Sequence, residues 1–271
     1  MHTAAAVPVD GFSHGPLVPL AAYAMACFGS AVGLRCTARA RTLKPSNRSG
    51  WLLLGSVAIG AGVFTMHFVA MTGFSARGME ISYDLVTTYM SLLVGVVVVG
   101  LGIFLVGRRD RGTAALLGGG TVTGVGFAGM HYLGMAGMQM PGTISYDGPT
   151  VALSLAIAIV AATVALWFAT SVKFLGASLG AALIMGIAVG GMHYTAMGAA
   201  TVHAHDGAVS EATSTVGTLA PILVGPVLLL LLVGLFVTLD PMTERDAKRG
   251  GGSRPGGTAG ERLERTPFEH R

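Results

Sequence analysis

The chain has 271 residues, of which 52% are hydrophobic and only 11% are charged. Soluble domains carry roughly 25% charged residues, so this composition excludes an ordinary soluble globular protein and indicates a chain that lies in a membrane. The net charge is +4 at pH 7; because it follows membrane topology, as described below, we predict no nucleic-acid partner.

Seven apolar runs of about 20 residues follow one another along the chain, and each is long enough to cross about 30 Å of hydrocarbon. The predicted spans are 16–34, 51–74, 85–106, 113–138, 150–170, 174–200 and 217–239. The sequence therefore predicts an all-α, polytopic membrane protein with seven transmembrane helices in a lipid bilayer.

Positive charges lie in alternate gaps between these spans. Of the 17 Lys and Arg residues, 16 follow spans one, three, five or seven, and only Arg77 lies in another gap. Cytoplasmic loops of membrane proteins are enriched in Lys and Arg. The pattern therefore places the N-terminus outside and the C-terminus in the cytoplasm of a multi-pass protein of the plasma membrane. Six or eight spans would break the alternation.

The two ends of the chain are predicted to lie outside the helical part. Residues 1–15 contain no Lys or Arg, so they lack the basic region of a cleaved signal peptide and form an external N-terminal segment. Residues 16–240 form the seven-helix domain, and residues 241–271 form a disordered basic cytoplasmic tail. Cys27 and Cys36 make no CxxC pair, and we expect no structural disulfide.

One motif occurs three times, each time in the outer part of an even-numbered span. The copies are Met66-His67-Phe68-Val69-Ala70-Met71, Met130-His131-Tyr132-Leu133-Gly134-Met135 and Met192-His193-Tyr194-Thr195-Ala196-Met197. They start 64 and 62 residues apart, which predicts three two-helix repeats plus a seventh helix. Gly60, Gly124 and Gly186 stand six residues before the three copies, and we interpret them as sites of close helix packing.

The motif places an imidazole and thioethers at one depth in three helices, where ionisable residues are rare and usually functional. Residues at i and i+4 share a helix face, so His67 pairs with Met71, His131 with Met135 and His193 with Met197. Met66, Met130 and Met192 point about 100° away. Thioethers favour Cu(I), and imidazole suits copper, iron, nickel and zinc. We therefore predict a transition-metal site from these nine residues.

The loops after the first two copies repeat as well, as Ile81-Ser82-Tyr83-Asp84 and Ile144-Ser145-Tyr146-Asp147. The third loop carries His203, His205, Asp206 and Glu211 instead. These loops are external by the charge argument, so they either cover the motif ends or hold Tyr83 and Tyr146 as ordinary interfacial aromatics. The sequence leaves open whether His203 and His205 join the metal site.

Three Met-His-Tyr repeats within seven membrane helices resemble the MHYT family of bacterial integral membrane sensor domains, over roughly residues 12–240. The resemblance implies a copper site near the outer face, built from the three motif histidines and the six motif methionines. It also implies sensing of a diatomic gas: oxygen, carbon monoxide or nitric oxide. Phe68 departs from the pattern, so the tyrosine hydroxyl is lost in the first copy.

Many relatives in that family join the sensor to a diguanylate cyclase or phosphodiesterase, whereas only about 30 residues follow span seven here. We therefore expect no enzyme activity, and we expect a separate cytoplasmic signalling partner to receive the signal. The sequence also shows no nucleophile–base arrangement and no phosphate-binding loop.

Several other roles stay open. Copper or proton transport would use the same histidines but needs polar groups through the inner halves of the spans, where few occur. A haem-binding membrane subunit would need two strong axial ligands, which three equivalent histidines fit less well. A structural or assembly subunit of a membrane metalloenzyme is a third alternative, and helix packing alone is the simplest.

Overall fold

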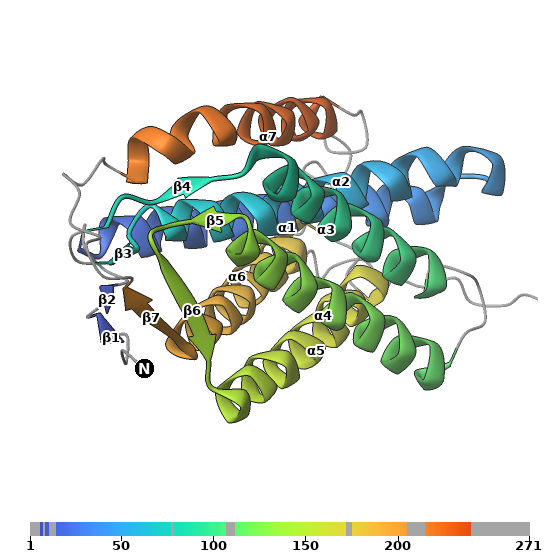
Figure 1. Ribbon diagram of the computed structural model, residues 1–271. Helices are drawn as coiled ribbons and strands as arrows, with labels where there is room; N and C mark the ends of the chain where they lie inside the picture. The colour runs from blue at the N-terminus through green and yellow to red at the C-terminus, as the bar shows by residue number, and fades with distance from the viewer. Residues whose placement is uncertain are drawn as a thin grey trace, which may run out of the picture.

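A computed structural model describes residues 6–7, 9–10, 15–76, 79–106, 112–171, 175–204 and 215–239. Its helices are α1 (Leu17–Thr42), α2 (Pro45–Met71), α3 (Leu85–Val106), α4 (Thr113–Ala136), α5 (Gly148–Ser171), α6 (Leu175–Gly198) and α7 (Thr215–Thr238) (Figure 1). All seven are long and apolar enough to cross a membrane, which confirms the predicted all-α polytopic class. The predicted basic tail and His205 lie outside the described residues.

The first two helices are longer than the predicted spans 16–34 and 51–74. Arginine is a good helix former, so α1 continues past the apolar stretch to Thr42. Proline at the first position then starts α2 at Pro45. Most of the basic residues between the first two predicted spans therefore lie at the ends of α1 and α2. Arg41 donates to the carbonyl of Thr170, and Arg48 donates to the carbonyl of Ala40 at 3.2 Å.

Helices α1 to α6 close into a ring, because each packs against the next and α6 packs against α1. The motif helices α2, α4 and α6 alternate with α1, α3 and α5, and α2 also contacts α4 and α6. Helix α7 lies outside the ring against α2 (Figure 1). As a result 78% of the most apolar window of α2 is buried, against 28–44% in the other helices. The three repeats therefore occupy equivalent places in the ring. The first repeat differs because α7 covers its motif helix, α2.

The repeat glycines lie where each motif helix meets the next helix of the ring. A Cβ on Gly60 would come within 2.8 Å of the Val96 backbone in α3, and one on Gly124 within 2.6 Å of the Ile159 nitrogen in α5. A Cβ on Gly186 would lie 2.9 Å from the ring of Tyr23 in α1. The predicted role of these glycines in close packing is confirmed.

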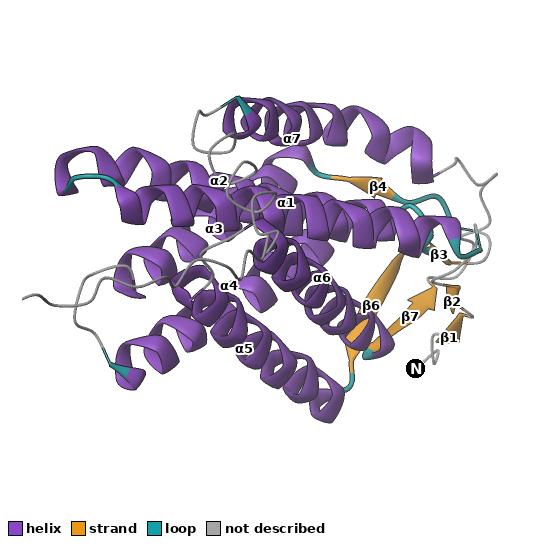
Figure 2. Ribbon diagram, turned by 180° about the vertical axis from the view of Figure 1, so that it is seen from behind, coloured by secondary structure: helices purple, strands orange, loops and turns teal. Residues whose placement is uncertain are grey.

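Short strands gather at one end of the bundle (Figure 2). They are β1 (Ala6–Val7), β2 (Val9–Asp10), β3 (Ser75–Ala76), β4 (Ser82–Tyr83), β5 (Met138–Gln139), β6 (Gly142–Tyr146) and β7 (Ala200–Ala204). They form antiparallel sheets in the orders β1–β7–β6, β2–β3 and β4–β5. We call this end, where α2, α4 and α6 finish, the motif end, and the opposite end, with Arg41 and Arg48, the arginine end. The strands tie the loops after all three motifs to the N-terminal segment.

The repeated Ile-Ser-Tyr-Asp loops begin the next helix of the ring. The hydroxyl and the backbone N–H of Thr87 donate to Asp84 at 2.6 and 2.8 Å, and Thr150 donates to Asp147 in the same way. These bonds hold the pKa of both carboxyls below the usual value. Both caps are therefore present at neutral pH and are lost in acid, as the pH falls through the lowered pKa.

The tyrosines of these two loops differ in exposure. Tyr83 is only 8% exposed and packs its ring against Phe68, with centroids 5.8 Å apart. Tyr146 packs against Tyr132 at 5.5 Å but remains 38% exposed. The interpretation as an ordinary interfacial aromatic is wrong for Tyr83, because the β4–β5 pair holds its ring against the motif helix.

A substitution series in α4 tests the glycine packing. We expect Gly124→Ala to destabilise the protein by about 1–3 kcal/mol, because the added methyl meets the α5 backbone. Gly118→Ala is the control, since a Cβ there meets nothing within 4 Å. Thermal unfolding in detergent measures both variants, and equal midpoints would contradict the packing role.

Candidate metal centre

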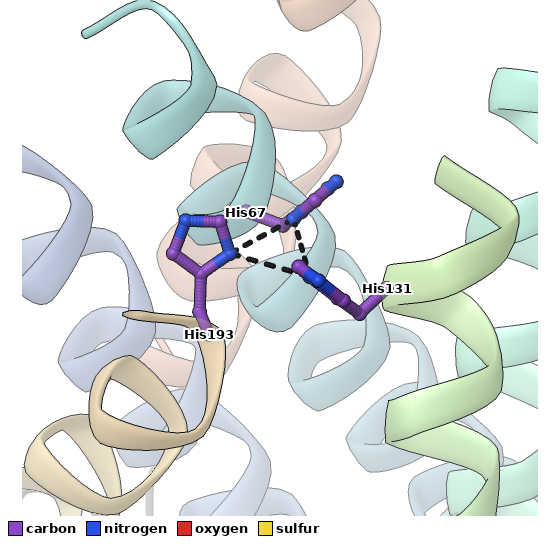
Figure 3. Close-up of side chains that lie close together, drawn as sticks. All are labelled: His67, His131 and His193. Atoms are coloured by element: carbon purple, nitrogen blue, oxygen red, sulfur yellow. Dashed lines mark hydrogen bonds between the residues drawn. The ribbon is translucent and has the colours of Figure 1, made fainter. Parts of the chain in front are cut away.

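Each motif helix contributes one histidine to a single cluster inside the ring. His67 comes from α2, His131 from α4 and His193 from α6, and their rings converge (Figure 3). The side chains are only 1–2% exposed. The motif copies, spaced 64 and 62 residues apart, thus bring three imidazoles to the same depth and into one cluster.

The rings meet through their Nδ1 atoms. The distances are 3.0 Å between His67 and His193, 3.1 Å between His131 and His67, and 3.3 Å between His193 and His131 (Figure 3). Among the described residues, Nε2 of His67 and Nε2 of His131 are buried and have no hydrogen-bond partner. Packing and the Nδ1 triangle therefore hold these two rings.

A triangle of imidazole nitrogens cannot satisfy itself. Each Nδ1 of a neutral ring is either a donor with its hydrogen or an acceptor with its lone pair, never both. Among three Nδ1 atoms, at least two must be both donors or both acceptors. Such a pair cannot form a hydrogen bond, so at most two of the three contacts are true hydrogen bonds. A cation between the rings removes the conflict, because it accepts all three lone pairs.

The triangle has the size that a metal ion needs. Sides of 3.0–3.3 Å put its centre about 1.8 Å from each nitrogen, and metal–imidazole bonds are roughly 2.0–2.1 Å long. The three ligand atoms form the one potential metal-binding group of His, Cys, Asp or Glu within the described ranges. The donor set fits a transition metal that prefers nitrogen.

The motif methionines fall into two sets. Met66, Met130 and Met192, which precede the histidines, are buried in one core cluster. Met71 and Met135 are buried in a second cluster at the motif end, against which the partly buried Met197 packs. The histidines thus lie between two apolar clusters that contain thioethers, and the assignment of any methionine as a ligand stays a prediction.

Aromatic rings flank the histidines edge-on. The centroid distances are 4.6 Å from His67 to Phe68, 4.9 Å from His131 to Tyr132 and 5.0 Å from His193 to Tyr194. The Tyr132 hydroxyl is 2.9 Å from Ser154 Oγ in α5. Phe68 has no hydroxyl. At the equivalent depth of α3, Ser91 donates to the Thr88 carbonyl, as Ser154 does to the Val151 carbonyl in α5.

Two residues at the site were missed in the sequence. Ser154 is a hydrogen-bond partner of Tyr132. A serine in an apolar span forms no recognisable motif, so the sequence did not indicate this role. Gly134 makes room for the first histidine, because a Cβ there would lie 2.8 Å from His67 Nε2. The sequence does contain a signal for Gly134, because the other two copies have an alanine at this position, Ala70 and Ala196.

His203 does not join the triad. It lies in β7, opposite Thr143 of β6, and its Nε2 is 3.0 Å from the Ser145 hydroxyl. The strand pairing accounts for its position, so the open question about this histidine is settled by the β-sheet.

Comparison with known proteins places the chain among bacterial signalling proteins. The MHYT family model, described as a bacterial signalling protein N-terminal repeat, matches residues 60–119 and 124–182. Both matches begin at a repeat glycine and run from one motif helix into the next. No solved structure matches the chain.

Similar proteins carry signalling names. The bifunctional diguanylate cyclase/cyclic di-GMP phosphodiesterase MucR of Pseudomonas aeruginosa is 38% identical over 65% of this chain and 26% of its own length. An uncharacterized signaling protein of Caulobacter vibrioides is 29% identical over 86% of this chain and 29% of its own length. The cyclic di-GMP phosphodiesterase NbdA of Pseudomonas aeruginosa is 32% identical over 71% and 26%. The chain thus spans less than a third of these relatives.

The seven spans and these relationships define a multi-pass membrane protein of the bacterial signalling class. The chain belongs to the MHYT family, as its three repeats indicate. The MHYT domain is a sensor module and is not itself catalytic. The activities named for the relatives belong to those whole proteins.

Gly134 offers a test of the triad geometry. We expect Gly134→Ala to push the His67 ring and weaken metal binding by roughly 10–100-fold, the cost usual when a residue that orients a metal ligand is changed. Gly129→Ala is the control in the same helix, because a Cβ there meets open space. Competition with a chromophoric chelator measures both, and equal affinities would show that Gly134 does not position His67.

Proposed function

We propose that this domain binds one copper ion through Nδ1 of His67, His131 and His193 and senses a diatomic gas, or copper itself, for a bacterial signalling system. The convergence of the three Nδ1 atoms at 3.0–3.3 Å supports the site. The family and the signalling names of the relatives support the sensing role.

Copper is favoured by the surroundings of the triad. Three imidazoles alone would also suit zinc. The motif methionines add soft thioethers in the clusters on both sides, and thioethers select Cu(I). With three protein ligands, a bound Cu(I) would keep a coordination position open for oxygen, carbon monoxide or nitric oxide.

The packing of α7 on α2 suggests how a structural change at the three histidines is transmitted to the rest of the protein. At the motif end, Phe64 and Phe68 of α2 share a cluster with Leu219 of α7. Near the arginine end, the rings of Trp51 and Phe236 lie 5.6 Å apart. A shift of His67 would move α2, and α7 packs along both of its ends, so we propose that this pair carries the signal.

The output is proposed to lie on the cytoplasmic side, at the arginine end. Arg39, Arg41 and Arg48 lie there, and enrichment of such residues marks cytoplasmic ends of spans. The motif end would then face outward. Two relatives are named for cyclic di-GMP turnover, so we propose that the signal controls that chemistry through a domain or a separate partner.

Metal analysis of detergent-purified protein tests the site. We expect about one copper per chain after reconstitution with Cu(I), because one triangle holds one ion. The variant with His67, His131 and His193 all changed to Ala should retain none, whereas His203→Ala should bind copper normally. Copper kept by the triple variant would contradict the assignment, and preferential loading with zinc would contradict the choice of metal.

Gas binding is tested on the same samples. Carbon monoxide added to the Cu(I)-loaded wild type should give a metal-carbonyl stretch in the infrared that the triple variant lacks. The Cu(I)-loaded wild type could instead bind neither carbon monoxide nor nitric oxide, with its copper not oxidised by oxygen. That result would contradict gas sensing and favour copper itself as the signal.

A further inference from the structure

An open cavity of about 180 Å³ lies between α1 and α6. The residues that line it include Ala22 of α1, Ile187, Gly190, Gly191 and Tyr194 of α6, and Met66 of α2. None of its lining residues is charged. Enclosed apolar cavities of about 150 Å³ take up xenon or benzene, so the volume here is large enough for a small apolar molecule.

The inner wall of the cavity lies beside the histidine cluster. Met66 directly precedes His67 and is only 1% exposed, so the cavity reaches a core side chain of the ring. Tyr194 directly follows His193, and its ring lies edge-on to that histidine at 5.0 Å. Two of the three histidines therefore have a sequence neighbour in the cavity wall.

The outer edge of the cavity faces the surroundings of the bundle. Ile187 is 66% exposed, and its neighbours Leu183 and Ile184 on α6 are 51% and 50% exposed. These apolar residues lie within a membrane span. The cavity therefore opens toward lipid hydrocarbon.

The sequence of the third repeat explains why the cavity lies here. At the positions of Gly190 and Gly191, the second repeat has Ala128 and Gly129, and the first has Phe64 and Thr65. A Cβ on either glycine of the third repeat would meet nothing within 4 Å. Two adjacent glycines thus leave space that the other repeats fill at least in part.

We propose that this cavity is a lateral entrance by which a small uncharged molecule passes from the bilayer hydrocarbon to the histidine cluster. An apolar, lipid-facing wall admits molecules that dissolve in hydrocarbon and excludes ions and water. The inference rests on the proposed function only for its destination, the metal held by the triad. The cavity itself can be tested without any metal.

Xenon is the probe for the metal-free protein. Crystals of the wild type pressurised with xenon should show a xenon atom between α1 and α6. Gly191→Leu should abolish it, because the side chain fills the open space, and Gly190→Leu should do the same from the adjacent position. Gly129→Leu is the matched control: it changes the equivalent glycine of the second repeat, which does not line the cavity. No xenon in the wild type, or xenon retained in both filled variants, overturns the proposal.

Carbon monoxide tests the route to the site in Cu(I)-loaded protein. After flash photolysis, rebinding from the bilayer should slow by about tenfold or more in Gly191→Leu and Gly190→Leu, since entry would then wait for helix motion. The carbonyl stretch should not change, and Gly129→Leu should rebind at the wild-type rate. Equal rates in all variants overturn the route while leaving the copper site intact. Absence of carbon monoxide binding in every variant counts against the proposed function, and the xenon result then decides the cavity alone.

Discussion

Three imidazole nitrogens that meet in a buried core are the constraint on which the rest of the structure depends. The Nδ1 atoms of His67, His131 and His193 stand 3.0–3.3 Å apart, yet their hydrogens and lone pairs cannot all be matched. Buried polar groups normally find partners, because an unmet one costs about 1–3 kcal/mol. The ring of helices keeps this cluster buried although at least one of its three Nδ1 contacts cannot be a hydrogen bond.

The ring can bring the histidines together because its helices approach closely. Gly60 and Gly124 each place a motif helix against the backbone of the next helix, and the Asp84 and Asp147 caps begin those helices at matching points. The close-packing glycine and the aspartate cap both occur in the first and the second repeat, so these two repeats pack against the next helix in the same way. The third repeat relaxes this packing at Gly190 and Gly191, and the cavity lies there.

Much of this arrangement could be predicted from the sequence, because hydrophobic length and repeat period are strong signals. The seven spans and the shared depth of the histidines follow from them. The extension of α1 beyond residue 34 could not, since arginines suit both a loop and a helix end. The paired strands depend on contacts between distant loops, and the role of Gly134 depends on where His67 points. The placement of α7 on α2 is likewise a tertiary choice that no local pattern contains.

Phe68 shows how the outer helix and the site belong together. In the second repeat, the equivalent Tyr132 hydroxyl reaches Ser154. In the first repeat, the ring is 0% exposed and lies in the cluster that α7 completes with Leu219 and Ile222. A hydroxyl buried there would need a partner of its own, so phenylalanine suits the helix that α7 covers. The one motif without its tyrosine therefore stands on the helix that connects the histidine cluster to the only helix outside the ring in the described part of the chain.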